Sequence, residues 1–470
     1  MSAFHRFLSL ALGLASLAAH AQNWTPPTQE ELQMTSEAEA PGAAAVCLSL
    51  DVFDDYNKTM THTVYVRLKI LNDKGRDFAD VEIPYGSGDL KVKAIEARTI
   101  HSNGAVVEFS GKPYDKLIEK GKHVKYKTKV FTLPDAQVGS ILEYRITLGY
   151  RPDWLAQPQW FVQQRYFIRK AHFDFAPNQQ YPLDLSKYSS VLPTGTSVQY
   201  DAKRKMYSLD VADIPPILDE DYMPPLDSIS YRVLFYLTKF QSPDEYWKVE
   251  GDAWSKQTDE FMKTNKLGGI AGQLVRPSDT PRQKAEKIYD AVMKLENTSL
   301  TREQSQAENK AHRVKLRNAE DIWNAKRGDS DELAVLFVGL ARAAGLKAYA
   351  AQVTDRSRAI FVHNFLSVDQ LDDYIAIVEL DGREEYLDPG VRYCPFGDLY
   401  WKHSGTKGLR QTDHGPEIGT TPTLGYKSTS VFRNADLNLD GDGKVHGSLH
   451  IGMTGNQALA WRLAALATDE

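Results

Sequence analysis

A serine at the predicted start of a helix and two aspartates at the ends of a predicted hairpin are the residues whose positions could support chemistry. Ser330 lies in the first turn of an expected helix, 329–344, where unpaired backbone N–H groups favour negative charge. Asp373 begins the first strand of an expected hairpin, 374–387, and Asp388 ends the second. A helix-start, a strand-start and a strand-end residue together form the arrangement of a nucleophile, a base and an orienting carboxylate.

The helix that would position Ser330 has a distinct sequence signature. Asp329 and Glu332 fit a capping box at its start, and Gly345 fits its end. The residues between are apolar nearly all round, which predicts a central, buried helix. The apolar segment that follows, 346–353, predicts a buried strand, and an Asp-Gly pair at 381–382 predicts the turn of the hairpin.

Two segments carry a specific resemblance, KRGDSDELAVLFVGLARAAGL at 326–346 and DDYIAIVELDGREEYLDPG at 372–390. With their spacing, they resemble the transglutaminase-like superfamily. That resemblance implies a papain-like α+β fold with a cysteine on the helix, a histidine at the strand start and an aspartate at the next strand's end. These three positions fall on Ser330, Asp373 and Asp388, so only the aspartate keeps its type.

The upstream region carries a second resemblance. The segment FTLPDAQVGSILEYRITL, at 131–148, is similar to the domain of unknown function that precedes transglutaminase-like domains in exported bacterial proteins. The two resemblances together cover residues 46–412 and imply a multidomain bacterial protein.

The substitutions at the triad positions remove the groups that cysteine-type acyl transfer needs. A serine hydroxyl gains less from a helix start than a thiol does, and it requires a base beside it. A carboxylate with a pKa near ~4 is a poor base for a hydroxyl. Adjacent acids, Asp372 and Asp373, would also repel an anionic intermediate. We therefore expect a transglutaminase-like pseudoenzyme with a degenerate triad, Ser330, Asp373 and Asp388.

Rival chemistry remains open at two residues. His363, in the expected loop 354–372, could serve as an alternative base and form a set with Ser330 and Asp388. The simpler interpretation is a loop histidine with local hydrogen bonds. Cys394 follows the Asp-Pro-Gly turn and not a helix start, so we expect a buried, small apolar side chain.

No metal or cofactor is expected. The acids Asp372, Asp373 and Asp388 could in principle gather a divalent cation, but they lack histidine partners and a repeated spacing. The segment 438–443 mimics the first half of an EF-hand loop. Its twelfth position is Leu449 and its flanks alternate as strands do, so we expect a hairpin turn.

The region 46–211 predicts a β-sandwich domain. Apolar residues alternate with polar ones through 63–71, which places one face of a strand in a core. Turn signals separate the strands, and helical periodicity is scarce. Similar short strands are expected at 122–133, 140–149 and 162–175.

The rest of the chain divides into three parts. Two Pro-Pro pairs in 212–228 predict a linker. Two amphipathic helices, capped by Ser242 and Thr280, open the transglutaminase-like domain at 229–412. Residues 425–470 are expected to begin a C-terminal β domain that is incomplete. The predicted fold class is α+β multidomain.

The N-terminal residues 1–21 read as a cleaved signal peptide. Arg6 precedes the apolar stretch 7–18, and 19–21 is a small-x-small cleavage site. The apolar stretch is too short to span a bilayer, and no later segment is expected to be transmembrane. The sequence therefore predicts export to the periplasm or secretion.

The net charge and the cysteine count exclude some classes of partner and of scaffold. The formal net charge of -6 carries no basic excess, so no nucleic-acid partner is expected. With only 2 cysteines, Cys47 and Cys394, a disulfide scaffold is excluded. We expect an inactive binding or scaffold module for a polypeptide or cell-envelope partner. The alternatives are an active hydrolase or acyl transferase that uses Ser330 as its nucleophile, and a glycan-binding or adhesion protein.

Overall fold

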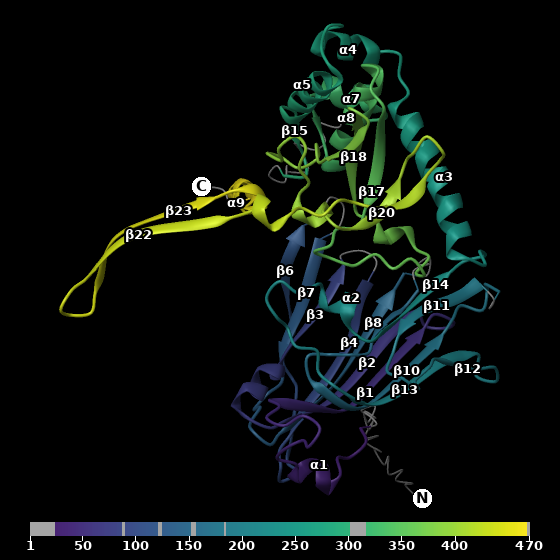
Figure 1. Ribbon diagram of the computed structural model, residues 1–470. Helices are drawn as coiled ribbons and strands as arrows, with labels where there is room; N and C mark the ends of the chain where they lie inside the picture. The colour runs from purple at the N-terminus through teal and green to yellow at the C-terminus, as the bar shows by residue number, and fades with distance from the viewer. Residues whose placement is uncertain are drawn as a thin grey trace, which may run out of the picture.

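The computed structural model shows a β-rich domain, an α+β domain at one end of it and a projecting C-terminal hairpin (Figure 1). It describes residues 24–86, 90–120, 125–151, 157–182, 185–300 and 316–467. The predicted signal peptide lies outside the described residues. Within those ranges, no helix is both long and apolar enough to cross a membrane.

An eight-stranded sheet forms the main layer of the β-rich domain, in the order β12-β13-β10-β1-β2-β8-β4-β5. Neighbouring strands are antiparallel except for β1 and β10, which run parallel. In β2, Val66, Leu68 and Ile70 are buried as predicted for 63–71. Arg67 and Lys69 between them are buried as well, because the Glu143 carboxylate and the Leu32 carbonyl accept their hydrogen bonds, so burial does not alternate along this strand. The strands are β1 (Ala45–Asp55), β2 (Thr61–Ile70), β4 (Leu90–Ile100), β5 (Val106–Glu108), β8 (Ile141–Tyr150), β10 (Phe167–Ala176), β12 (Gln199–Asp201) and β13 (Met206–Ile214).

Two three-stranded sheets, β3-β7-β6 and β11-β14-β9, share one hydrophobic core with the large sheet. Phe131 of β7, Phe173 of β10 and Phe235 of β14 all belong to that core. The region is therefore β-rich, as predicted. The strands are β3 (Asp80–Gly86), β6 (Tyr114–Lys120), β7 (Lys125–Thr132), β9 (Gln159–Phe161), β11 (Ser186–Val191) and β14 (Arg232–Leu237).

The boundary between the first two domains differs from the prediction. β14 follows the predicted linker 212–228 yet pairs with β11 and β9, so the β-rich domain continues to residue 237 and does not end at 211. The linker itself begins inside β13 and ends in a short helix, α2 (Leu226–Ile229). Proline interrupts strand pairing locally, but the chain can return to the same core afterwards.

A five-stranded antiparallel sheet, β19-β18-β17-β20-β21, supports the second domain, which is of the predicted α+β class. β21 ends at Thr420, so this domain extends beyond the predicted limit of 412. Its strands are β17 (Ala348–Val353), β18 (Asp373–Leu380), β19 (Arg383–Leu387), β20 (Lys407–Arg410) and β21 (Glu417–Thr420). Its helices are α3 (Pro243–Met262), α4 (Leu267–Leu274), α5 (Pro281–Met293), α7 (Ala319–Ala325) and α8 (Ser330–Ala343).

Helix α8 lies at the centre of the α+β domain. It packs on β17 and β18 on one side and on α4, α5 and α7 on the other. Residues 333–341 of α8 are all buried, which confirms the predicted central helix. Asp329 and Glu332 form the predicted capping box, and Gly345 takes a positive φ of 81° after the helix. The capping serine and threonine of α3 and α5 are also as predicted.

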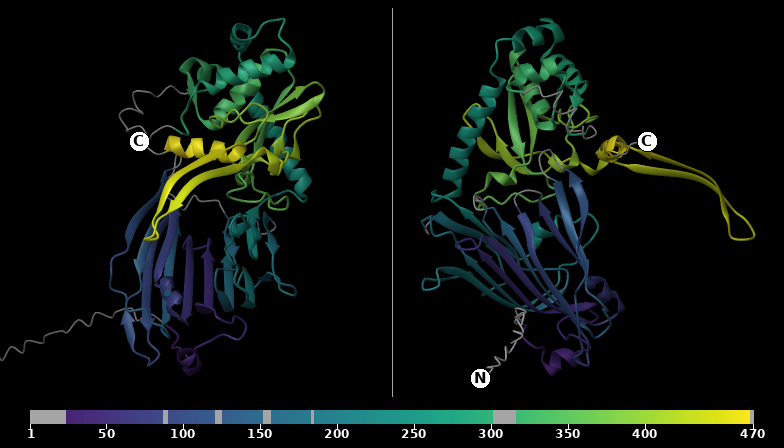
Figure 2. Two further views of the ribbon diagram at one scale, coloured as in Figure 1. Left: turned by 60° about the vertical axis from the view of Figure 1, so that its left-hand side comes forward. Right: turned by 180° about the vertical axis from the view of Figure 1, so that it is seen from behind.

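The C-terminal segment forms a long hairpin, β22 (Val431–Leu439) and β23 (Val445–Met453), followed by α9 (Gly455–Ala467). Figure 2 shows the hairpin extending away from both domains. The predicted turn at 438–443 is confirmed, because Asp440 accepts hydrogen bonds from the backbone N–H groups of Asp442 and Lys444. The EF-hand-like pattern is therefore a hairpin turn.

Candidate functional site

Ser330, Asp373 and Asp388 come from three elements whose ends meet. The Asp331 carboxylate accepts the backbone N–H of Tyr374 at 3.1 Å, which joins the start of α8 to the start of β18. The turn after β19 reaches the same place, because a Cβ on Gly390 would lie 2.3 Å from the Ser330 carbonyl oxygen. The fold thus gathers the three predicted positions, and their chemical roles remain a prediction.

Both polar groups of Ser330 have partners within the protein. Its hydroxyl oxygen accepts a hydrogen bond of 3.2 Å from the Asn297 side-chain amide. Its backbone N–H donates to the Ser299 hydroxyl at 3.1 Å. Acyl transfer at this serine would need a base at the hydroxyl and free donors for the oxyanion. The structure instead places a donor at the hydroxyl and an acceptor at the N–H.

Asn297 is a residue that the sequence analysis missed. Two short parallel strands, β15 (Glu296–Asn297) and β16 (Arg327–Gly328), place it beside the start of α8. Its amide nitrogen donates to the Gly390 carbonyl at 2.8 Å, and its amide oxygen accepts the Ser299 N–H at 2.9 Å. These contacts fix the orientation of the amide, so a donor faces Ser330.

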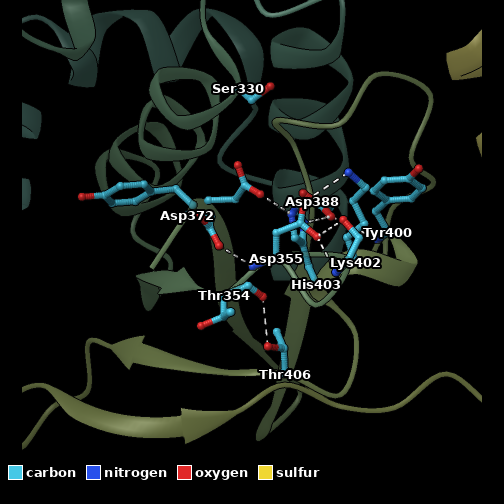
Figure 3. Close-up of polar contacts among 12 residues, drawn as sticks. Ser330, Thr354, Asp355, Asp372, Asp388, Tyr400, Lys402, His403 and Thr406 are labelled. Carbon is cyan, nitrogen blue, oxygen red and sulfur yellow. Dashed lines mark hydrogen bonds and ion pairs between the residues drawn. The ribbon is translucent and has the colours of Figure 1, made fainter. Parts of the chain in front are cut away.

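His403 is the second residue that the sequence analysis missed, and it links the two aspartates. Its Nδ1 lies 2.7 Å from Asp388 Oδ2 and its Nε2 lies 3.1 Å from Asp373 Oδ2. His403 ends a short 3-10 turn, Trp401–His403, and the residue is 4% exposed. In Figure 3, no dashed line joins this group to Ser330.

The two carboxylates hold His403 in its charged form. Burial by itself lowers the pKa of the ring, but the charge of Asp388 and the hydrogen bonds to both aspartates raise it from 6.5 to about 10. Carboxylates only accept, so both ring nitrogens must carry a proton. An imidazolium with two donated N–H groups has no lone pair for a serine proton.

Asp388 is fully buried at the centre of this group. Its Oδ2 accepts from His403 and from the backbone N–H of Tyr400 at 3.0 Å. Its Oδ1 has no hydrogen-bond partner among the described residues. The predicted orienting carboxylate thus holds a histidine, but that histidine turns toward Asp373 and not toward the serine.

Two family models match the chain. The model of DUF3857, a domain of unknown function, matches residues 57–218, and the model of the transglutaminase-like superfamily matches residues 268–366. The chain joins a DUF3857 domain to a transglutaminase-like domain. The second match includes Ser330 and ends before Asp373, so it bears on α8 and not on the hairpin.

One solved structure shares the fold of this chain, and a second was matched at a much lower TM-score. A candidate protease from Parabacteroides distasonis is 11% identical and covers 81% of this chain and 72% of its own, with a TM-score of 0.55. A candidate cysteine protease from Cytophaga hutchinsonii is 10% identical and covers 85% of this chain and 91% of its own, with a TM-score of 0.22. The first likeness shows a shared fold. A comparison with curated proteins gives no significant match.

His363, the predicted alternative base, lies against α3 of the transglutaminase-like domain. Its Nε2 is 3.0 Å from an Asp244 carboxylate oxygen, and its carbonyl accepts the Trp247 indole N–H at 2.9 Å. No hydrogen bond joins it to Ser330 or Asp388. The structure therefore supports the loop histidine with local contacts and does not assemble the rival triad.

Asp372 faces away from the aspartate–histidine group. Its carboxylate accepts the Asp355 backbone N–H at 3.0 Å and forms an ion pair with Arg358. Burial raises the pKa of Asp372. Because the acids face different partners, they do not converge on one point. In the part of the chain that the structure describes, no group of three or more His, Cys, Asp or Glu side chains could hold a metal ion.

Both cysteines of the chain are free and buried. Burial raises the pKa of the Cys394 thiol, and the Asp388 charge adds to that effect. Burial likewise raises the pKa of the Cys47 thiol to about 12. A thiol that stays protonated is a poor nucleophile, so Cys394 fits the predicted buried, small apolar side chain.

Proposed function

We propose that this is an exported protein whose transglutaminase-like domain does not catalyse acyl transfer and binds a polypeptide partner in the cell envelope. One observation carries the proposal: the buried histidine beside the site, His403, is committed to Asp373 and Asp388 and not to the Ser330 hydroxyl. The signal-like residues 1–21 support export.

The hydrogen bonds of Ser330 support inactivity independently. The Asn297 amide donates to the hydroxyl oxygen and occupies one of its lone pairs, so the oxygen is a weaker nucleophile. An oxyanion on the acyl group would need backbone donors beside Ser330, but the N–H of Ser330 itself already donates to the Ser299 hydroxyl. Base, nucleophile and oxyanion donor are thus all compromised at one position.

The ordered surroundings of Ser330 support a binding role. Asn297 and Gly390 hold the start of α8 against the turn after β19 through direct contacts. A surface whose side chains are fixed by such contacts loses little conformational entropy when it binds a partner. The domain thus keeps a defined shape at the place where the superfamily's chemistry is expected.

Activity assays test the inactive state. Purified protein is incubated with a glutamine-containing peptide and a fluorescent primary amine, and in parallel with ester substrates. We expect turnover no higher than that of the Ser330→Ala variant. Turnover that this variant abolishes would overturn the proposal. Ser330-dependent labelling by a fluorophosphonate would favour the serine hydrolase or acyl transferase.

Binding is tested separately by fluorescence anisotropy with the same peptide. We expect binding to wild type and to Ser330→Ala, and loss of binding in Ser330→Trp, whose indole would cover the surface. Thermal unfolding of each variant provides the folding control. A peptide that binds all three proteins equally would place the partner elsewhere on the molecule.

A further inference from the structure

A cavity of about 700 Å³ lies between the β-rich domain and the transglutaminase-like domain. One wall comes from β9, α2 and β14, and the other from α3 and residues 358–370. The two walls touch where Ile360 N–H donates to the Ser228 hydroxyl at 2.9 Å and where the rings of Tyr236 and Phe365 meet at 5.8 Å. The volume falls within the range of small-molecule sites.

The most unusual lining residue is Arg232 of β14. It is 8% exposed, and no carboxylate among the described residues lies within ion-pair distance of it. Its Nη1 donates to the carbonyls of Ser228 at 2.6 Å and Ser230 at 3.2 Å. A guanidinium has five N–H donors, so these two contacts leave donors for a ligand. Burial lowers the pKa of Arg232, so the surrounding protein groups do not fully offset the cost of burying its charge.

A carboxylate is the group that this arginine would bind best. Guanidinium and carboxylate match in a planar, two-bond geometry, and burial strengthens the attraction. Asp227 also lines the cavity, and its charge partly offsets the effect of burial on Arg232 without forming an ion pair. A ligand that carries an ammonium group as well as a carboxylate would satisfy both side chains.

The rest of the lining indicates what the carboxylate is attached to. Phe161, Ile360 and Phe365 supply apolar and aromatic surface, and Ile360 is 45% exposed. Gln159 and Ser367 place amide and hydroxyl groups among them. Such a mixed wall suits a peptide, whose backbone needs hydrogen bonds, better than an alkyl chain, which needs none.

We infer that the cavity between the two domains binds short apolar peptides through their free α-carboxylate, with Arg232 as the carboxylate-binding residue. Asp227 favours peptides whose α-amine is also free. The inference rests on Arg232 and not on the Ser330 site, so it can stand or fail independently of the proposed function.

Calorimetric titration of the full chain with three probes tests the inference. The probes are the dipeptide Leu-Phe, its C-terminal amide and its N-acetyl derivative. We expect Leu-Phe to bind most tightly, the acetyl derivative to bind a few-fold more weakly, and the amide to bind at least about tenfold more weakly. Equal binding of Leu-Phe and its amide to wild type would overturn the inference. So would the absence of any Leu-Phe binding, or binding of laurate in preference to Leu-Phe.

Variants assign the effect to the cavity. Arg232→Gln should bind Leu-Phe and its amide equally, and Arg232→Lys should keep part of the discrimination because it keeps the charge without the fork. Asp227→Asn should remove the preference over the acetyl derivative. Arg165→Gln is the matched control, since Arg165 pairs with Asp219 on the exposed surface. If Arg232→Gln still binds Leu-Phe more tightly than its amide, the assignment to Arg232 is contradicted. The comparison of the two probes on the wild-type protein remains a test even if a variant fails to fold.

Discussion

The Ser330 site and the cavity around Arg232 differ in whether their buried polar groups have partners within the protein. At the first, His403 and Asn297 are saturated by contacts within the protein. At the second, a buried guanidinium faces a cavity with no carboxylate in ion-pair distance among the described residues. The sequence draws attention to the first place, because it matches a catalytic pattern. The contacts favour the cavity around Arg232 as the site of a small ligand, because a ligand could supply the counter-charge that the protein does not.

The largest expected effect is at Asp388. Asp388→Ala would leave the buried imidazolium of His403 with only Asp373 as a counter-charge, and breaking a buried pair costs about 3–5 kcal/mol of folding free energy. Urea unfolding measures the loss. Asp290→Ala, at an exposed position of α5 in the same domain, is the control and should change stability by less than about 0.5 kcal/mol. Similar stability of the two variants would mean that the cluster is not a structural element.

A pH series tests the same cluster without truncating it. The pKa of His403 is raised from 6.5 to about 10, so the folded protein keeps a proton that the unfolded chain loses. The stabilisation that this proton provides is complete below about pH 6.5. The free energy of unfolding should therefore fall by a few kcal/mol as the pH rises toward about 10. His403→Asn should flatten this decline. His446→Asn, in the exposed hairpin, should not.

Gly390 tests how tightly the turn lies on Ser330. A Cβ at this position would meet the Ser330 carbonyl oxygen at 2.3 Å, so Gly390→Ala must displace the start of α8. Overpacking of this kind costs about 1–3 kcal/mol, measured by chemical unfolding. Gly272→Ala is the contrasting variant, because open space surrounds that glycine of α4 and alanine favours a helix. A loss in Gly272→Ala equal to that in Gly390→Ala would refute the close approach.

The smallest expected effect, and the sharpest contrast with Asp388, is at Arg232. Arg232→Leu removes a buried cation that the Asp227 charge offsets only in part, and it also removes two hydrogen bonds to carbonyls. These terms oppose each other, so stability should change by no more than about 1 kcal/mol. Calorimetric melting measures it. A loss as large as that of Asp388→Ala would show that Arg232 is a structural residue.

Local patterns predicted the elements around Ser330 well. Helix α8 has a capping box, an apolar surface and a closing glycine within one short segment, and all three were legible in the sequence. The hairpin of β18 and β19 likewise follows from the two-residue Asp-Gly turn between them. In each case the residues that determine the structure are close neighbours along the chain.

The contacts of the site could not be predicted in this way. His403 reaches Asp388 and Asp373 across 15 and 30 residues, from a short turn with no periodic pattern. Asn297 reaches Ser330 across 33 residues. The placement of both depends on how loops cross the finished fold, and no spacing rule connects such residues. The only available signal was composition, a histidine and an amide within the same domain as a triad that lacked them.

The late return of β14 to the β-rich domain has a practical consequence. Residues 215–225 join β13 to α2, yet β14 beyond them pairs with β11 and β9 of the first domain. A protease that cuts this exposed connection would sever the backbone but leave the second piece held by two strand ladders. The nicked protein should migrate as two bands under denaturing conditions and elute as one particle under native ones.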